Sequence, residues 1–170
     1  VFPAWSPDGQ KIAWFSDASG EYQLVISSQE GLEKPRTIAL PSPTFYFRPQ
    51  WSPDSKHIAY TDTDYNLWFI NVESGQPKKV DTERYAHPNR SLNPVWSPDS
   101  KWIAYARLLD NQHKAIKAYN IETGVTHQLT DGMSDAISPV WDANGKYLYF
   151  LASTNFALNT GWLDMSSYQM

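Results

Sequence analysis

The sequence predicts an all-β protein of 170 residues, built from one antiparallel unit of four strands that is repeated along the chain. Three observations predict it. A tryptophan-containing motif recurs at a nearly constant spacing, a short segment rich in β-branched and aromatic residues follows each copy, and turn-forming residues separate the segments. Apolar residues alternate with the period of two that is typical of strands, which excludes a helical solenoid.

The repeated motif sets the length of the unit. Its tryptophans are Trp5, Trp51, Trp96 and Trp141, so successive copies lie 46, 45 and 45 residues apart. The first three copies continue as Ser-Pro-Asp-Gly or Ser-Pro-Asp-Ser, in which proline presets the backbone, aspartate can bond its nearby backbone, and the last residue ends the turn. Each copy is expected to close a hairpin. The fourth copy does so through Asn144-Gly145, a pair that indicates a different turn type.

Further strands follow each motif. Second strands are expected at residues 11–14, 56–60, 101–105 and 146–150, third strands at 22–26, 66–72 and 115–121, and fourth strands at 36–40, 77–80 and 126–130. The fourth strands are polar, which suits a sheet edge that faces solvent. In the last repeat Trp162–Met165 is expected to be the third strand, with no room for a fourth.

The second strands are apolar on both faces, because Ile58 and Tyr60 share one face while Ala59 occupies the other. Such strands belong to sheets that are sandwiched between neighbouring sheets. Four-stranded sheets that recur about every 45 residues, covered on both faces, are typical of a β-propeller. We therefore expect a β-propeller fragment of about four blades, at residues 1–46, 47–91, 92–136 and 137–170, with the last blade truncated. The repeated tryptophans are expected to fill the space between adjacent blades.

The ring is expected to be incomplete, because propellers contain roughly 4 to 8 blades and 170 residues with this repeat length supply a little under four. The chain begins Val1-Phe2-Pro3 and has no methionine before Met133, which is typical of a fragment of a longer protein. Unclosed blades would expose an apolar sheet face and an unpaired strand edge. We therefore expect self-association through these blades.

Composition excludes several classes of partner. Hydrophobic residues make up 41% of the chain, mean hydropathy is −0.53, and no apolar run approaches the roughly 20 residues that cross a bilayer. The 14 basic and 18 acidic residues give a net charge of −4, without the basic cluster that nucleic-acid binding requires. The chain has no cysteine, so neither disulfides nor thiolate metal sites can stabilise it. Membrane and nucleic acid are therefore not expected as partners.

The motif Trp-Ser-Pro-Asp-Gly/Ser, followed by lysine and Ile-Ala-aromatic, resembles the WD-repeat-like propeller repeat of TolB, of prolyl oligopeptidase relatives and of tricorn-type proteases. Residues 129–132, 138–141 and 149–162 are similar to the propeller region of bacterial tricorn homologues. That resemblance implies a parent serine protease in which propellers precede a PDZ domain and a catalytic domain and guide or gate peptides. It implies a peptide or protein ligand, no cofactor, and no catalysis by this chain itself.

The residues before the repeated prolines are candidates for a substrate channel. They are Arg48, Asn93 and Ser138, and they approach the channel because the first strand of a blade lies innermost. The loops at residues 81–91 and 131–138 are further candidates for a binding face, since loops on a rigid scaffold often carry function.

Neither a catalytic nor a metal site is expected. There is no Gly-x-Ser-x-Gly motif, and the histidines occupy unrelated positions of the repeat: His57, His87, His113 and His127. Asp62 to Glu73 imitates a calcium loop, but Leu67 stands where glycine is needed, so a hairpin is expected there.

Two alternative functions remain open at this point. The chain could belong to a TolB-like protein-interaction propeller, or to the propeller cap of a prolyl-oligopeptidase-type peptidase. The part of the parent protein that follows the propeller would distinguish these functions. A PDZ segment with a catalytic Ser and His would indicate the tricorn-like protease, and a free C-terminus would indicate the TolB-like module. A Gly-x-Ser-x-Gly motif would indicate the prolyl-oligopeptidase-type peptidase. A bacterial source is implied, and the compartment, cytoplasm or periplasm, stays undecided.

Overall fold

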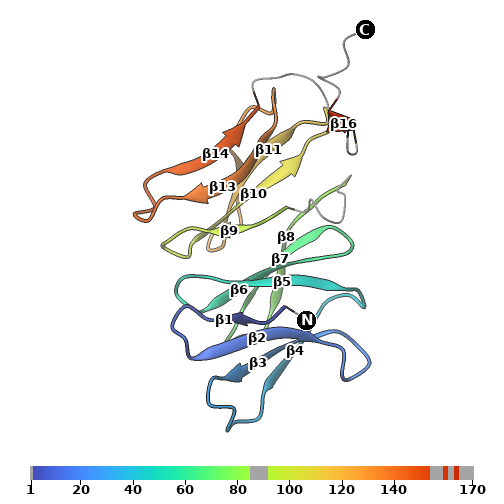
Figure 1. The fold of residues 1–170 in the computed structure, drawn as a ribbon, viewed down its shortest axis with the longest axis vertical. Helices are drawn as coiled ribbons and strands as arrows, with labels where there is room; N and C mark the ends of the chain where they lie inside the picture. The colour runs from blue at the N-terminus through green and yellow to red at the C-terminus, as the bar shows by residue number, and fades with distance from the viewer. Residues whose placement is uncertain (1, 85–91, 154–158, 161–162, 165–170) are drawn as a thin grey trace.

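The structure is a computed structural model that describes residues 2–84, 92–153, 159–160 and 163–164. The described residues form strands and turns, arranged as a stack of sheets (Figure 1). The first sheet contains β1 (Ala4–Trp5), β2 (Lys11–Ser16), β3 (Gln23–Ser28) and β4 (Arg36–Ala39); the second contains β5 (Tyr46–Trp51), β6 (His57–Asp62), β7 (Asn66–Asn71) and β8 (Pro77–Thr82); the third contains β9 (Val95–Trp96), β10 (Trp102–Leu108), β11 (Lys114–Asn120) and β12 (Thr126–Gln128). Each is an antiparallel meander, so the expected propeller blades are confirmed. Within the described part of the chain, no helix has the length and apolarity that crossing a membrane requires.

In the described part of the chain, the fourth blade contains fewer strands than the others. It consists of β13 (Ala136–Trp141) and β14 (Leu148–Ala152). The prediction that Trp162–Met165 is the third strand of this blade is wrong. The described part of this segment, β16 (Leu163–Asp164), pairs with β15 (Asn159–Thr160) and not with β14. Trp162 and Met165 lie outside the described residues. The sequence could not predict this outcome, because a short apolar segment fits more than one pairing partner.

The turns of the repeated motif are built from serine and aspartate side chains. In the second blade Ser52 Oγ donates to Asp54 Oδ1 at 2.5 Å and accepts from His57 N at 2.9 Å, and Asp54 Oδ1 also accepts from Lys56 N at 3.0 Å. The same bonds recur in the first and third blades. The expected bonding of the aspartate to its nearby backbone is therefore confirmed. In the fourth blade Asp142 Oδ1 takes over the role of the serine by accepting from Tyr147 N at 2.9 Å.

Two hydrogen bonds recur between neighbouring blades. The indole Nε1 of Trp51 donates to the Ala4 carbonyl at 3.0 Å, and that of Trp96 donates to the Gln50 carbonyl at 3.1 Å. In the opposite direction a main-chain N–H donates to the last serine of the next motif: Asp8 N to Ser55 Oγ at 3.2 Å, and Asp54 N to Ser100 Oγ at 3.0 Å. These bonds fix the position of each blade relative to the next.

The outer members of the tryptophan series differ from the inner ones. Trp51 is 8% exposed, whereas Trp5 is 57% exposed, so the expectation that each tryptophan fills an inter-blade space is wrong for Trp5. No described blade covers the Trp5 side of the first sheet. Trp141 is half-buried, but its Nε1 has no hydrogen-bond partner among the residues that the structure describes, and Gly145 replaces the serine whose hydroxyl would accept from the third blade.

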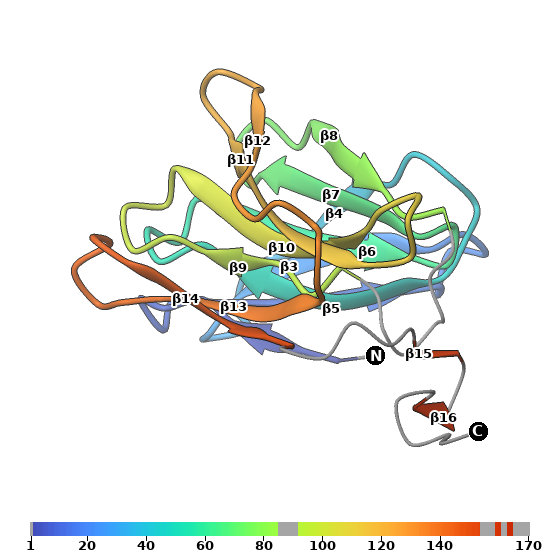
Figure 2. The same cartoon turned by 90° about the horizontal axis from the view of Figure 1, so that it is seen from above.

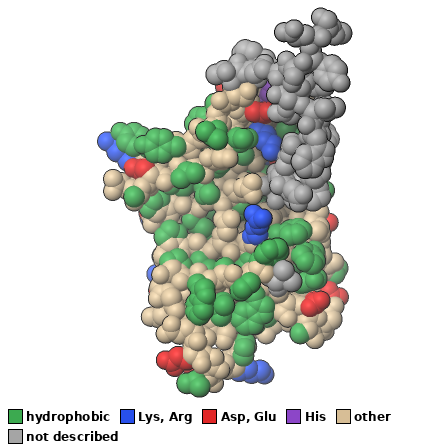
Figure 3. Space-filling view, in the orientation of Figure 1, with side chains coloured by type: hydrophobic (Ala, Val, Ile, Leu, Met, Phe, Trp, Pro, Cys, Tyr) green, Lys and Arg blue, Asp and Glu red, His purple; other side chains and the backbone are tan. Residues whose placement is uncertain are grey.

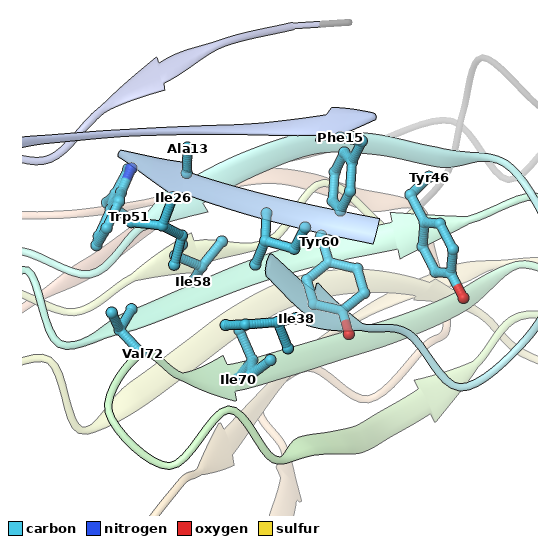
Figure 4. Packing of buried hydrophobic residues seen from close by; sticks show 11 residues of the cluster. Ala13, Phe15, Ile26, Ile38, Tyr46, Trp51, Ile58, Tyr60, Ile70 and Val72 are labelled. Carbon is cyan, nitrogen blue, oxygen red and sulfur yellow. The ribbon is translucent and has the colours of Figure 1, made fainter. Parts of the chain in front are cut away.

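The core lies between the blades. One cluster, shown in Figure 4, fills the space between the first and second sheets and contains Phe15, Tyr46, Ile58 and Tyr60. A second cluster, which includes Ala59, Ile103 and Tyr105, fills the space between the second and third sheets. Ile58 and Tyr60 thus face the first blade while Ala59 faces the third, as their alternation predicts. Burial of apolar side chains on both faces of each inner blade is the main stabilising contribution.

Replacing Trp96 by phenylalanine removes the donor to the Gln50 carbonyl and keeps most of the aromatic area. We expect the free energy of unfolding to fall by about 1 kcal/mol, because the carbonyl loses its partner at a partly buried site. Urea unfolding followed by circular dichroism measures it. Trp5→Phe is the matched control and should change stability by less than about 0.5 kcal/mol. Equal losses in both variants would contradict a role for the inter-blade bond.

Candidate functional site

The residues before the repeated prolines share an uncommon backbone conformation. Their φ angles are 61° for Phe2, 43° for Arg48, 38° for Asn93 and 54° for Ser138, all in the left-handed region. A residue with a Cβ is disfavoured there by about 1–2 kcal/mol, and the residue before proline is further restricted by the proline ring. The same strained position therefore recurs once in each of the four repeats.

In the second and fourth blades the strain accompanies a β-bulge in the innermost strand. In the second blade Phe47 pairs with Thr61 and Gln50 pairs with Ala59, so Arg48 and Pro49 together stand opposite one residue of β6. In the fourth blade the pairing of Ile137 with Leu151 is followed by that of Val140 with Tyr149, which leaves Ser138 and Pro139 in the same arrangement. Bulges of this kind change the direction of a side chain.

The bulge separates buried from exposed residues. Pro49, Pro94 and Pro139 are buried, whereas the preceding residues Arg48, Asn93 and Ser138 are exposed. Among the described residues, the innermost strands β1, β5, β9 and β13 each pair on one side only. These strands lie along one side of the stack, with β8 and β12 on the opposite side (Figure 2). The three sequence-predicted residues therefore share one side of the molecule, next to unpaired strand edges.

We call Phe2, Arg48, Asn93 and Ser138 the inner row. The side chains of Arg48, Asn93 and Ser138 form no hydrogen bond or ion pair with any described residue. Together they offer a permanent cation, an amide and a hydroxyl, groups that can bond peptide carbonyls or carboxylates. Phe2, which is 48% exposed, adds an apolar member that the sequence analysis missed. Its position before Pro3 is the signal that would have identified it.

The described start of the first candidate binding loop, at residues 81–84, contacts the third blade. Asp81 forms ion pairs with Arg107 at 3.2 Å and Lys117 at 3.6 Å, and accepts from the Tyr105 hydroxyl at 2.9 Å. Glu83 is buried and accepts from Leu108 N at 2.9 Å, and burial raises the pKa of its carboxyl group. These residues fasten the second blade to the third. Residues 85–91 lie outside the described part.

The described histidines show no catalytic arrangement. His57 Nε2 lies 3.2 Å from Asn71 Nδ2 and its ring packs near Trp96, while His127 lies against the ring of Trp102. His113 Nδ1 lies 3.8 Å from Asp135. His87 falls outside the described residues. Among those that are described, no serine hydroxyl bonds to a histidine ring, and no three His, Asp or Glu side chains gather as metal ligands.

The calcium-like segment is a hairpin, as expected. The carboxylate of Asp62 is buried and accepts from Asn66 N at 2.9 Å, from Asn66 Nδ2 and from Trp68 Nε1 at 2.8 Å. Both of its oxygens thus serve the β6–β7 connection. Leu67 lies in β7, where it is fully buried.

Replacing Arg48 by glycine should relieve the left-handed strain at one bulge. We expect a gain of about 0.5–1 kcal/mol in the free energy of unfolding, because glycine adopts positive φ without a Cβ clash but loses more chain entropy on folding. Urea unfolding measures the gain. Arg48→Ala keeps the Cβ and should give none. A gain as large with alanine would show that the side chain, and not the backbone, is strained.

The pKa of His57 is lowered by burial of its ring. In the unfolded chain the imidazole has its ordinary pKa of about 6.5, so the unfolded state binds a proton at higher pH than the folded state does. The contribution of neutral His57 to the free energy of unfolding is therefore complete above the unfolded pKa, and it is lost as pH falls through the folded pKa. Denaturation midpoints between pH 8 and pH 5 should therefore fall more steeply for the wild type than for His57→Gln. The exposed His127→Gln control should keep the wild-type slope, and parallel slopes in all three proteins would contradict the prediction.

Comparison with known proteins agrees with the geometry. Residues 2–160 match the family model described as the tricorn protease second beta propeller domain. The chain is 26% identical over 152 residues to the "Uncharacterized peptidase YuxL" of Bacillus subtilis (strain 168), covering 89% of this chain and 21% of that protein. The chain thus spans about a fifth of the length of this curated relative.

Solved structures show the same fold. The crystal structure of the tricorn protease superposes with a TM-score of 0.74 at 20% identity, over 85% of this chain and 14% of that one. TolB from Acinetobacter baumannii superposes with a TM-score of 0.61 at 20% identity, over 88% of this chain and 37% of that one. Since the family model covers nearly every residue, the chain belongs to the family of the tricorn protease second beta propeller domain.

Proposed function

We propose that this chain is a non-catalytic propeller segment of a tricorn-like serine protease, and that its inner row guides or gates peptide substrates. The observation that carries the proposal is the row itself: exposed polar side chains at equivalent positions, each held in a strained conformation beside an unpaired strand edge. Strain of this kind persists where the surrounding structure enforces it, and it is enriched at functional sites. Family membership and the similarity to a peptidase support a proteolytic parent.

The chemistry of the row suits an extended peptide. An unpaired strand edge offers main-chain donors and acceptors, which an extended peptide can bond without regard to its sequence. Arg48 adds a cation that attracts carboxylates, and Asn93 and Ser138 add weaker, adaptable bonds. Contacts that are individually weak suit a surface along which a peptide moves. The catalytic residues of the proposed parent would then lie elsewhere in the polypeptide.

The experiment measures binding and hydrolysis on the same 170-residue protein. A fluorescein-labelled extended peptide with a free C-terminal carboxylate is titrated and followed by anisotropy. We expect binding that weakens roughly fivefold in Arg48→Ala, about 1 kcal/mol, and no cleavage of the peptide. Lys34→Ala removes an exposed cation far from the row in the repeat and is the control. Unchanged binding in Arg48→Ala, or hydrolysis by the purified chain, would overturn the proposal.

A TolB-like interaction module is the second candidate, favoured by the superposition on the TolB propeller. It differs from the first in what the ligand does: a module retains its partner, whereas a guide releases it. The same titration separates the two. Slow dissociation from one protein partner would favour the module, and fast exchange among unrelated peptides would favour the guide.

We also propose that the isolated chain self-associates through its outer blades. Tyr149 and Leu151 on one face of β14 and Phe150 on the other are exposed, and within the described part of the chain β14 pairs with β13 only. In Figure 3 hydrophobic side chains lie over the first blade and around the β13–β14 turn at the upper left. Exposed apolar strands of this kind favour association. Sedimentation should show species larger than the monomer, and a stable monomer at high concentration would contradict this.

A further inference from the structure

A groove of about 690 Å³ opens between the second and third blades, on the side that carries the motif turns. These turns lie together on one side of the stack, at the left in Figures 1 and 2. The second blade lines the groove with Asp54, Phe69 and Lys78, and the third blade with Asp99, Ile121 and Glu122. It lies apart from the inner row, so an inference about it does not depend on the function proposed above.

The corresponding place between the first and second blades is filled by a guanidinium group. Arg36, at the start of β4, donates from Nη1 to the Val72 carbonyl at 2.5 Å and from Nη2 to the Glu73 carbonyl at 2.8 Å. Gly75 permits this approach, because a Cβ at that position would lie 3.1 Å from Nη2. One planar group thus bonds two successive carbonyls of the next blade.

Lys78 occupies the position of Arg36 in the second blade. Arg36 pairs with Ile26, and Ile26 pairs with Ala13. One repeat later, Lys78 pairs with Phe69, and Phe69 pairs with Ala59. Ala13 and Ala59 are the same position of the motif, so the register makes the two basic residues equivalent.

The turn that faces Lys78 repeats the turn that faces Arg36. Gly75 N donates to the Asn71 carbonyl at 2.9 Å, and Gly124 N donates to the Asn120 carbonyl at 2.9 Å. In both turns the asparagine Oδ1 caps the next two free N–H groups. The carbonyls of Ile121 and Glu122 therefore correspond to those of Val72 and Glu73. No described group donates to them, and the ammonium group of Lys78 forms no bond within the described residues.

Charge and shape favour an external cation with several donors. Four carboxylates line the groove, those of Asp54, Glu73, Asp99 and Glu122, against the ammonium groups of Lys78 and Lys101. Lys101 is paired with Glu122 at 3.2 Å. Ile121 is half-buried and supplies apolar surface for a methylene stem. A lysine ammonium is a point charge, whereas a guanidinium presents a rigid fork that can bond two carbonyls at once.

We propose that this groove binds the guanidinium group of an arginine side chain on a peptide partner. The bound group lies on the carbonyls of Ile121 and Glu122, as Arg36 lies on those of Val72 and Glu73. The surrounding carboxylates balance its charge, and the stem lies against Ile121.

The test uses N-acetyl-arginine amide and N-acetyl-lysine amide as probes of the 170-residue protein, with binding followed by NMR chemical shifts. We expect the arginine probe to bind roughly tenfold more tightly than the lysine probe. Shifts should be confined to residues of the groove. Equal affinity for both probes, or no shift in the groove at any probe concentration below denaturing levels, would overturn the proposal.

Lys78→Arg gives the sharper outcome. Its own guanidinium should occupy the two carbonyls, so binding of the arginine probe should weaken at least roughly tenfold while the unfolding midpoint rises. Lys79→Arg, one residue along and over the Trp68 ring, is the matched control and should leave both unchanged. If Lys78→Arg binds the arginine probe as tightly as the wild type does, the proposed site is wrong. Arg48→Ala should bind the arginine probe as the wild type does, which separates this result from failure of the inner row.

Discussion

The inter-blade hydrogen bond of the tryptophan indole is the interaction on which the architecture depends. Trp51 and Trp96 each donate to the main chain of the preceding blade, and a serine of the same motif accepts from that blade. Apolar packing brings the sheets together without fixing their rotation. Directional bonds at both ends of the motif turn fix it, so the spatial relation of one blade to the next repeats with the sequence.

The same repetition places strain and polar groups in register. The buried prolines of the innermost strands cannot donate to a ladder, and the residue before each of them takes positive φ. The bulge turns that residue outward. A feature that costs stability in each blade thus produces an ordered series of exposed side chains, which a single loop could not position along several blades.

Much of this fold could be predicted from the sequence, because strands, turns and blade order follow from local patterns that recur four times. The role of Asp54 in its turn and the opposite faces of Ile58 and Ala59 were predictable for that reason. The pairing of β16 with β15 was not, since a two-residue strand carries little register information. The inner row was predicted in three of its members, but its left-handed backbone was not. The reason to expect a guanidinium in the groove is the equivalence of Arg36 and Lys78, which only the strand register reveals.

Two features of the last motif affect the order in which parts of the molecule unfold. Gly145 offers no hydroxyl to the third blade, and the indole of Trp141 has no acceptor among the described residues. The seam between these blades therefore lacks both directional bonds that secure the earlier seams. Local opening begins where the fewest cooperative contacts must break. We therefore expect the amide protons of β13 and β14 to exchange with solvent before those of the second blade, which is packed on both faces.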